Sequence, residues 1–131
     1  MALERFDTIV VGAGQAGIAA SEHLSNHGTQ HVVLERSRIA ERWRTARWDS
    51  LVANGPAWHD RFPNLEFESA DPDSFVHKDA VADYFVAYAE KINAPVRCGV
   101  EVLSVERKDH ERGFLVKTDK GDFEALNVVV A

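Results

Sequence analysis

The sequence contains one cysteine, Cys98, among its 131 residues. A single thiol excludes an internal disulfide framework, and sparse cysteine is typical of a reducing cytoplasmic compartment. Cys98 lies in a stretch where apolar residues alternate with polar ones, so we expect a buried structural thiol there. These features predict a cytoplasmic protein that is held together by a hydrophobic core.

Basic charge and long apolar runs are also scarce. The chain has 15 Lys and Arg residues against 21 Asp and Glu residues, a formal net charge of −6. It offers no extended basic field for phosphate backbones, so we expect no nucleic-acid partner. No apolar run reaches membrane-spanning length, and the uncharged run 8–20 follows Glu4 and Asp7 where a signal peptide would carry basic residues. We therefore expect no membrane partner.

Length and composition indicate one folded domain. Hydrophobic residues make up 45% of the chain and charged residues 27%, the balance of a globular protein. We expect a single domain over residues 1–131. The chain ends on "LNVVVA", which is typical of a buried strand. Such an ending favours the N-terminal part of a longer polypeptide, with a docked C-terminal strand as the alternative.

A strand, a glycine turn and a helix follow one another near the start of the chain. The segment "FDTIVV" is rich in β-branched and aromatic residues and predicts a buried strand. It leads into "GAGQAG", with Gly-x-Gly-x-x-Gly spacing, and then into a helix that Gly28 closes. The segment "HVVLE" predicts a second strand ending at Glu35, about 20 residues beyond the glycines, where a ribose-binding acid is expected.

Each residue type in this unit has a physical reason. Gly12 permits a tight turn, Gly14 lets a pyrophosphate approach the backbone, and Gly17 allows the helix to pack closely on the strand. The phosphates would meet a helix N-terminus, whose unpaired amides and positive dipole end bind anions. In the alternative interpretation the glycines only form a turn and Glu35 is a solvated strand end. The complete succession of strand, turn, helix and acid favours nucleotide binding.

The stretch "RWRTARWDSLVANGP" lies beyond the second strand and mixes aromatic with basic residues. About forty residues after Glu35 show no helical or strand period, whereas a nicotinamide-binding domain would continue with alternating strands and helices. Flat aromatic and cationic side chains suit a fused-ring cofactor with phosphates. Alternatively, the tryptophans fill the core and the arginines form a solvated rim. The residues concerned are Trp43, Trp48, Trp58, Arg42, Arg44 and Arg47.

The remaining chain predicts a helix and then a β-meander. Apolar residues at helical spacing form one stripe. They are Val81, Tyr84, Phe85, Tyr88 and Ile92. Alternating segments follow at residues 100–107, 114–118 and 122–125, and the closing "VVVA" would return to a parallel sheet. We therefore predict an α/β fold, a Rossmann-like doubly wound parallel sheet with an inserted antiparallel β-meander.

Other kinds of chemistry have little support in the sequence. His23 and His27 share a helical face, but no third ligand accompanies them, so we predict a solvated face and no metal. The chain also lacks a nucleophile elbow and a phosphate loop with Gly-Lys-Ser/Thr. We expect a bound cofactor to carry the chemistry.

Two of the segments described above together resemble a known protein family. The run "VVGAGQAGIAASEHLSNHGTQHVVLERS" followed by "RWRTARWDSLVANGP" resembles the N-terminal FAD segment of flavin-containing monooxygenases, in the bacterial class with two dinucleotide-binding domains. The resemblance covers nearly the whole chain, because "RFPNLEF", "KDAVADYFVAYAEKINAP" and "VRCGVEVLSV" follow in the family's order. One departure is that the family often has glycines just before its Trp-Arg pair, where this chain has Glu41 and Arg42.

The resemblance implies FAD as the cofactor and a role for each matching position. The glycine turn and the start of the helix would contact the pyrophosphate, the acid the adenosine ribose, and the next arginine the adenine. The Trp-Arg pair would lie on the flavin side, and one backbone position in "GVEVLSV" would meet the adenine. In that order the residues are Gly12, Gly14, Gln15, Ala16 and Gly17, then Glu35, Arg36, Trp43, Arg44 and Val102.

Asn54 is the catalytic candidate that the resemblance implies. It lies in "LVANGP", at the place where many of these enzymes hold an asparagine beside the reactive edge of the flavin ring. An Asn-Gly pair is also a common turn, and this second interpretation stays open.

The resemblance also implies an activity for the complete protein. NADPH or NADH would reduce FAD, oxygen would add to the reduced ring, and the flavin hydroperoxide would oxygenate a small organic substrate. The NAD(P)H-binding motif is absent from these residues, so we expect no turnover by them alone. One alternative is a flavin-dependent reductase or dehydrogenase without oxygenation. Another is a non-catalytic nucleotide-sensing Rossmann domain of a transport regulator, which should keep alternating strands and helices after residue 36.

Overall fold

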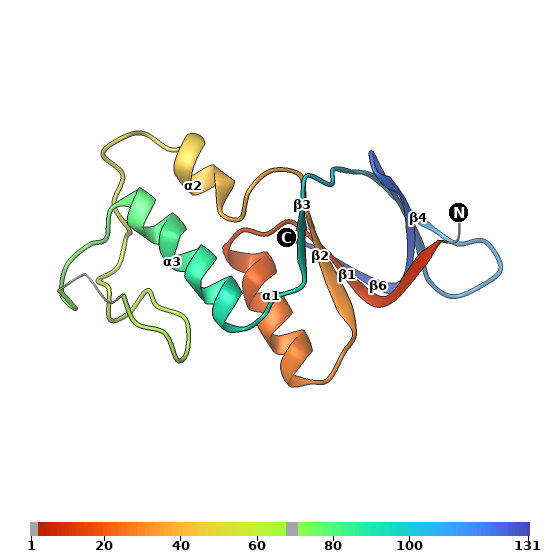
Figure 1. Cartoon of the computed structure of the whole chain (residues 1–131), viewed down its shortest axis with the longest axis horizontal. Helices are drawn as coiled ribbons and strands as arrows, with labels where there is room; N and C mark the ends of the chain where they lie inside the picture. Colours follow the sequence, from red (N-terminus) through yellow and green to blue (C-terminus); the bar gives the residue numbers. More distant parts are fainter. Residues whose placement is uncertain (1–2, 68–70) are drawn as a thin grey trace.

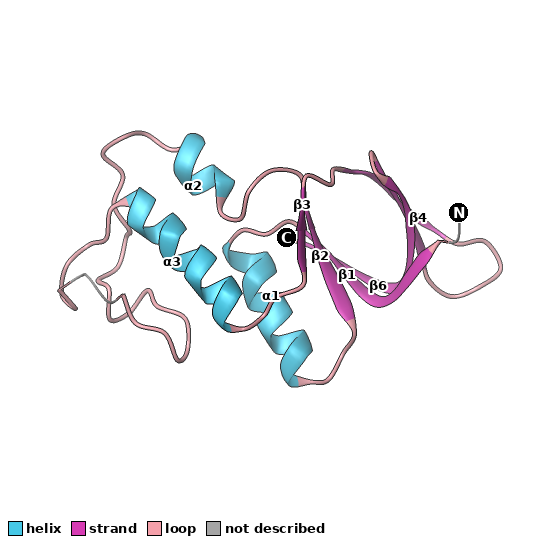
Figure 2. Ribbon diagram, viewed as in Figure 1, coloured by secondary structure: helices cyan, strands magenta, loops and turns pink. Residues whose placement is uncertain are grey.

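The computed structural model describes residues 3–67 and 71–131, which form one six-stranded sheet and three helices (Figure 1, Figure 2). In chain order the elements are β1 (Glu4–Val11), α1 (Gln15–Asn26), β2 (His31–Glu35), α2 (Glu41–Thr45), α3 (Lys78–Lys91), β3 (Val96–Cys98), β4 (Val102–Arg107), β5 (Phe114–Thr118) and β6 (Gly121–Val130).

The sheet has the strand order β3-β2-β1-β6-β5-β4. Strands β3, β2, β1 and β6 are parallel to one another, whereas β4, β5 and β6 form an antiparallel meander. A parallel order that moves outward from a central first strand and then returns to its other side is typical of dinucleotide-binding folds. The predicted α/β fold with a parallel sheet and a meander is confirmed.

Strand β6 joins the two parts of the sheet. Phe123 and Ala125 pair with β1 on one side and with β5 on the other. We expected a meander segment at residues 122–125 and a separate closing strand, but one continuous strand, Gly121–Val130, serves both purposes. The strand continues through Leu126 and Asn127, and Asn127 pairs with Thr8 of β1.

The central strands are buried on both faces. Successive residues of a strand point to opposite faces. On one face Val10 and Val33 pack against α1 residues such as Leu24, and on the other face Leu34 packs with Val116 of the meander. Figure 1 shows the three helices on one side of the sheet and the meander curling away on the other. Burial on both faces is expected of parallel strands.

Helix α3 carries the predicted apolar stripe and fastens the irregular segment before it. Tyr84, Phe85 and Tyr88 are buried in the helical core cluster. The hydroxyl of Tyr84 accepts the N–H of Phe62 at 2.6 Å and donates to the carbonyl of Leu65 at 2.6 Å. Tyr88 donates to the Glu22 carboxylate on α1, and burial raises the pKa of the Tyr88 hydroxyl. Helix α3 thus ties the irregular segment to α1.

Three features differ from the sequence-based expectation. Cys98 is exposed and not buried, because β3 is a three-residue edge strand with a neighbour on one side only. The Trp/Arg stretch contains a short helix, α2, whose five residues are too few to show a helical period. Residues Val96–Cys98 form a strand of their own, which we did not predict separately from residues 100–107.

Candidate functional site

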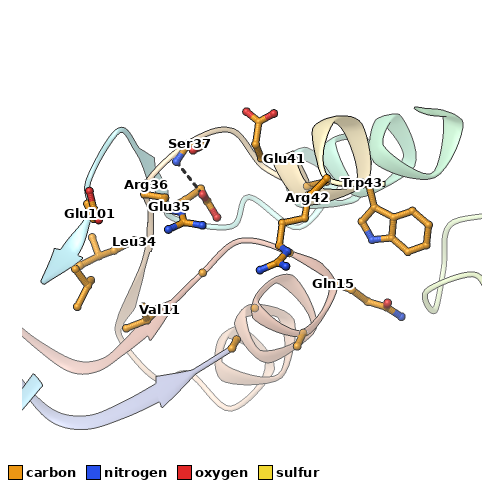
Figure 3. Close-up of a pocket in the computed structure, with 18 of the residues that line it drawn as sticks. Val11, Gln15, Leu34, Glu35, Arg36, Ser37, Glu41, Arg42, Trp43 and Glu101 are labelled. Carbon is orange, nitrogen blue, oxygen red and sulfur yellow. Dashed lines mark hydrogen bonds between the residues drawn. The ribbon is translucent and has the colours of Figure 1, made fainter. Parts of the chain in front are cut away.

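A pocket of about 910 Å³ opens where β1 and β2 end (Figure 3). The glycine turn, the start of α1, the end of β2, helix α2 and the start of β4 form its walls. In open α/β sheets, ligands bind outside the carboxyl ends of the strands. All the predicted cofactor contacts except Arg44 line this pocket: Gly12, Gly14, Gln15, Ala16, Gly17, Glu35, Arg36, Trp43 and Val102.

The three glycines of the turn differ in what surrounds them. Gly12 has a φ of +104°, and a Cβ there would lie 2.7 Å from the carbonyl oxygen of Ala131. A Cβ on Gly17 would lie 1.8 Å from the carbonyl oxygen of Gly12, so only glycine allows this helix to approach the turn so closely. By contrast, a Cβ on Gly14 would meet nothing within 4 Å among the described residues. The space beside Gly14 is open and can receive a ligand.

The N-terminus of α1 faces the pocket. The helix has 12 residues and begins at Gln15, and Gly14 is its N-cap. Within the described chain no side chain caps its first-turn amides, and its first turn holds no acidic residue. Because the first amides of a helix are unpaired and its N-terminal end is positive, this position suits a phosphate.

The carboxylate of Glu35 is fixed beside the glycine turn by two backbone amides. The N–H of Ala13 donates to Oε1 at 2.8 Å, and the N–H of Ser37 donates to Oε2 at 2.8 Å. A carboxylate offers about four acceptor positions, so both oxygens retain capacity for further donors such as ribose hydroxyls. The backbone of Glu35 is held as well, since its carbonyl accepts the N–H of Val100 at 3.0 Å.

Trp43 lines the pocket and also packs on the core. Its ring meets Phe85 edge-on, with 6.0 Å between centroids, and the Arg47 guanidinium lies 5.3 Å from the ring centroid. The core interpretation of this tryptophan is therefore supported, and its place on the flavin side stays a prediction. Trp48 is 63% exposed and Trp58 is 57% exposed, so these two neither fill the core nor line the pocket.

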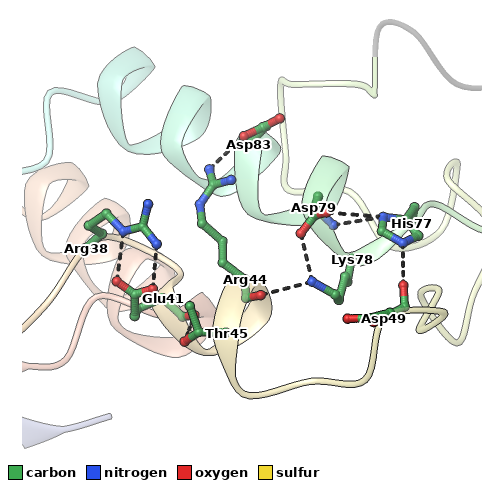
Figure 4. Close-up of polar contacts among 9 residues, drawn as sticks. All are labelled: Arg38, Glu41, Arg44, Thr45, Asp49, His77, Lys78, Asp79 and Asp83. Atoms are coloured by element: carbon green, nitrogen blue, oxygen red, sulfur yellow. Dashed lines mark hydrogen bonds and ion pairs between the residues drawn. The ribbon is translucent and has the colours of Figure 1, made fainter.

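The arginines of the same stretch have different surroundings. Arg38, just before α2, makes two hydrogen bonds of 2.8 Å to Glu41. These bonds lower the pKa of the Glu41 carboxyl from 4.5 to about 2. Arg44 points away from the pocket and pairs with Asp83 of α3 at 2.6 Å (Figure 4). Its predicted place on the flavin side stays a prediction.

Asn54, the catalytic candidate, also lies outside the pocket. It is exposed, and it follows a short pairing in which the N–H of Ala53 donates to the carbonyl of Val76 at 2.8 Å. The next residue, Gly55, donates its N–H to Asp60 at 2.8 Å, so Asn54 stands in a fixed turn. Its catalytic role stays a prediction.

Some lining residues were not predicted, among them Glu101 and Ser37, which orients Glu35. Arg42 also lines the pocket. The sequence placed it among the cationic residues that suit a cofactor with phosphates, and it is charged where the resembling family often has glycine. Within residues 3–67 and 71–131 no group of three potential metal ligands occurs. No helix in those residues is both long and apolar enough to cross a membrane.

The fold is a Rossmann-like FAD/NAD(P)-binding fold. Over residues 9–131 the sequence matches the family model described as pyridine nucleotide-disulphide oxidoreductase. The chain belongs to this family.

Curated relatives narrow the similarity further. The chain is 36% identical over 126 residues to a CzcO-like oxidoreductase of Geobacillus kaustophilus, which covers 95% of this chain and 35% of the relative. It is 35% identical over 115 residues to the indole-3-pyruvate monooxygenase YUCCA1 of Oryza sativa, covering 87% of this chain and 28% of the relative. The chain thus spans about a third of the length of these relatives.

Solved structures share the fold at lower identity. A flavin-containing monooxygenase from Stenotrophomonas maltophilia superposes with a TM-score of 0.86 at 23% identity, over 98% of this chain and 38% of the other. The bacillithiol disulfide reductase Bdr from Staphylococcus aureus gives a TM-score of 0.85 at 15% identity, with 98% and 38% coverage. At these identities the likeness concerns the fold alone.

Proposed function

We propose that this chain is the FAD-binding portion of a NAD(P)H-dependent flavin monooxygenase. One observation carries the proposal: a single pocket combines an open glycine cradle at Gly14, the N-terminus of α1, the fixed carboxylate of Glu35 and the aromatic face of Trp43. The anion site would suit the pyrophosphate of a flavin dinucleotide, the hydroxyl acceptor its adenosine ribose, and the flat apolar surface its ring.

Residues that line the pocket would hold the pyrophosphate, the adenosine and the ring of the cofactor. First-turn amides of α1 and the glycine turn would bind the pyrophosphate, and Glu35 would accept the adenosine ribose hydroxyls. Trp43 would limit the space for the ring. The assigned residues are Gly12, Gly14, Gln15, Ala16 and Gly17 for the pyrophosphate, Glu35 for the ribose, Arg36 and Val102 for the adenine, and Trp43 for the ring side.

The monooxygenase assignment goes beyond cofactor binding and is supported by relatives named as indole-3-pyruvate monooxygenases. In the complete protein, NADPH or NADH would reduce FAD, and oxygen activated as a flavin hydroperoxide would be transferred to a small organic substrate. Asn54 and Arg44 lie outside the pocket and would take part in the site only once other segments of the complete protein are in place. We also propose a cytoplasmic location.

An oxygen-incorporation assay on the complete protein tests this function. NADPH and NADH are supplied in turn, with isotopically labelled oxygen and a panel of indole-3-pyruvate, cyclohexanone and an aryl thioether. We expect one labelled oxygen atom in the product for each NAD(P)H oxidised. NAD(P)H oxidation that never labels any product would contradict the monooxygenase and favour a flavin-dependent reductase or dehydrogenase.

A further inference from the structure

The residue before Trp43 is the chain's own departure from the resembling family. Arg42 is exposed and lines the pocket together with Gly14 and Gln15. Figure 3 shows its side chain extending from α2 into the pocket, towards the glycine turn and the start of α1. The side chain of Arg42 thus extends from α2 towards the pocket wall that contains Gly14.

Three charged residues close to Arg42 in the chain have partners, whereas Arg42 has none among the described residues. Glu41 is bound by Arg38 through two hydrogen bonds, Arg44 pairs with Asp83, and Arg47 lies over the Trp43 ring. In the part of the chain that the structure describes, the guanidinium of Arg42 has no hydrogen-bond or ion-pair partner. The pairing of Glu41 also keeps a carboxylate at the pocket wall from opposing an anionic ligand.

The wall opposite Arg42 is formed by the glycine turn and the start of α1, and among the described residues it supplies dipoles but no cationic side chain. The glycine turn offers backbone amides, and α1 offers about half a positive charge at its N-terminus. A pyrophosphate carries more negative charge than that. A guanidinium group forms two parallel hydrogen bonds with a phosphate and is only weakly hydrated, which makes it suited to the uncovered side of such a ligand.

We propose that Arg42 binds the pyrophosphate of FAD from the α2 side, opposite the glycine turn. This inference rests on the proposed FAD site. It gives the pyrophosphate a clamp with amides on one side and a guanidinium on the other. Because the contact is charge-assisted, it makes FAD binding weaken with ionic strength.

Binding measurements with three ligands test this role in the complete protein freed of cofactor. FAD and ADP both contain a pyrophosphate, whereas adenosine lacks phosphate. The variants are R42Q, which removes the charge, R42K, which keeps it without the planar fork, and R112Q as a control on the exposed β4–β5 connection. Affinities for FAD and ADP are measured by calorimetry, adenosine binding by NMR titration, and folding by thermal unfolding.

We expect R42Q to bind FAD and ADP about tenfold to a hundredfold more weakly, with adenosine binding and thermal unfolding unchanged. R42K should restore part of the affinity, R112Q should match the unsubstituted protein, and salt should weaken FAD binding less in R42Q. A loss for FAD but not for ADP would overturn the assignment and move Arg42 to the ring. Equal affinities of R42Q and the unsubstituted protein would overturn it as well. A protein that binds neither FAD nor ADP before substitution would instead refute the proposed function.

Discussion

The ammonium group of Lys78 donates a hydrogen bond to the backbone carbonyl of Arg44 at 2.9 Å (Figure 4). Lys78 is 5% exposed and begins α3, whereas Arg44 lies near the end of α2. The bond therefore fastens the short helix that carries Trp43 to the longer helix behind it. The Arg44–Asp83 ion pair joins the same two helices. Five helical residues are too few to be stable alone, so α3 determines where this wall of the pocket lies.

Removal of the Lys78 contact should loosen α2. In K78M the carbonyl of Arg44 and the carboxylate of Asp79 both lose the ammonium group that they bind, and we expect the free energy of unfolding to fall by about 1–3 kcal/mol. Chemical denaturation measures the loss, and limited proteolysis should show faster cleavage within residues 42–52. K120M, at an exposed turn, is the control and should change neither. A K78M protein as stable and as resistant as the original would show that the contact holds nothing.

The glycine turn offers a pair of matched substitutions with opposite expectations. G17A places a methyl group 1.8 Å from the carbonyl oxygen of Gly12, so we expect it to prevent normal folding. G14A meets nothing within 4 Å among the described residues, and φ is −88° there, so it should unfold at the original temperature. Because its methyl group occupies the proposed pyrophosphate position, G14A should nevertheless bind FAD at least tenfold more weakly. Unchanged FAD affinity in a folded G14A would remove the phosphate from this turn.

Substitutions of two tryptophans test whether the flavin ring lies beside α2. Trp43 lines the pocket, whereas Trp58 is 57% exposed and lies outside it. We expect W43F to shift the visible absorption and the fluorescence of bound flavin, because the surroundings of the ring change. W58F, a substitution of the same chemistry, should leave both spectra as they are. Identical spectra for the two variants would place the ring away from α2.

Because of its pairing with Arg38, the carboxyl group of Glu41 should stay ionised beside the pocket down to low pH. Arg38 lowers the pKa of Glu41 from 4.5 to about 2 in the folded protein. A lowered pKa stabilises the fold above the unfolded-state value, and this contribution disappears as the pH falls from about 4.5 towards 2. NMR titration of the Glu41 carboxyl should show a midpoint near 2 and, in R38Q, a return towards 4.5. A midpoint near 4.5 in the unsubstituted protein would contradict the pair.

Local patterns in the sequence predicted most of the fold. The β1–turn–α1–β2 unit was predictable from the spacing of its glycines and from the strand-like run on each side. Helix α3 was predictable because its apolar residues recur with a helical period. Glu35 was predictable for the same reason, because its distance from the glycines follows from the lengths of α1 and β2. These features depend on residues close together in the chain.

Features set by distant residues were not predictable. Cys98 is exposed because β3 ends up at the sheet edge, which no pattern within its three residues reveals. Helix α2 is stabilised by contacts with residues of α3 more than thirty positions further along the chain, such as the bond between Lys78 and Arg44. Arg44 pairs with Asp83 only because α2 and α3 pack together in the fold. The same packing leaves Arg42 without a partner among the described residues.

The central claim is that the pocket holds FAD, and the visible absorption spectrum of the purified complete protein tests it most directly. Any cofactor released on denaturation is identified by chromatography. The account predicts the two bands of an oxidised flavin and the release of FAD. A protein that neither carries nor takes up FAD, yet binds a nicotinamide or adenine nucleotide, would contradict it.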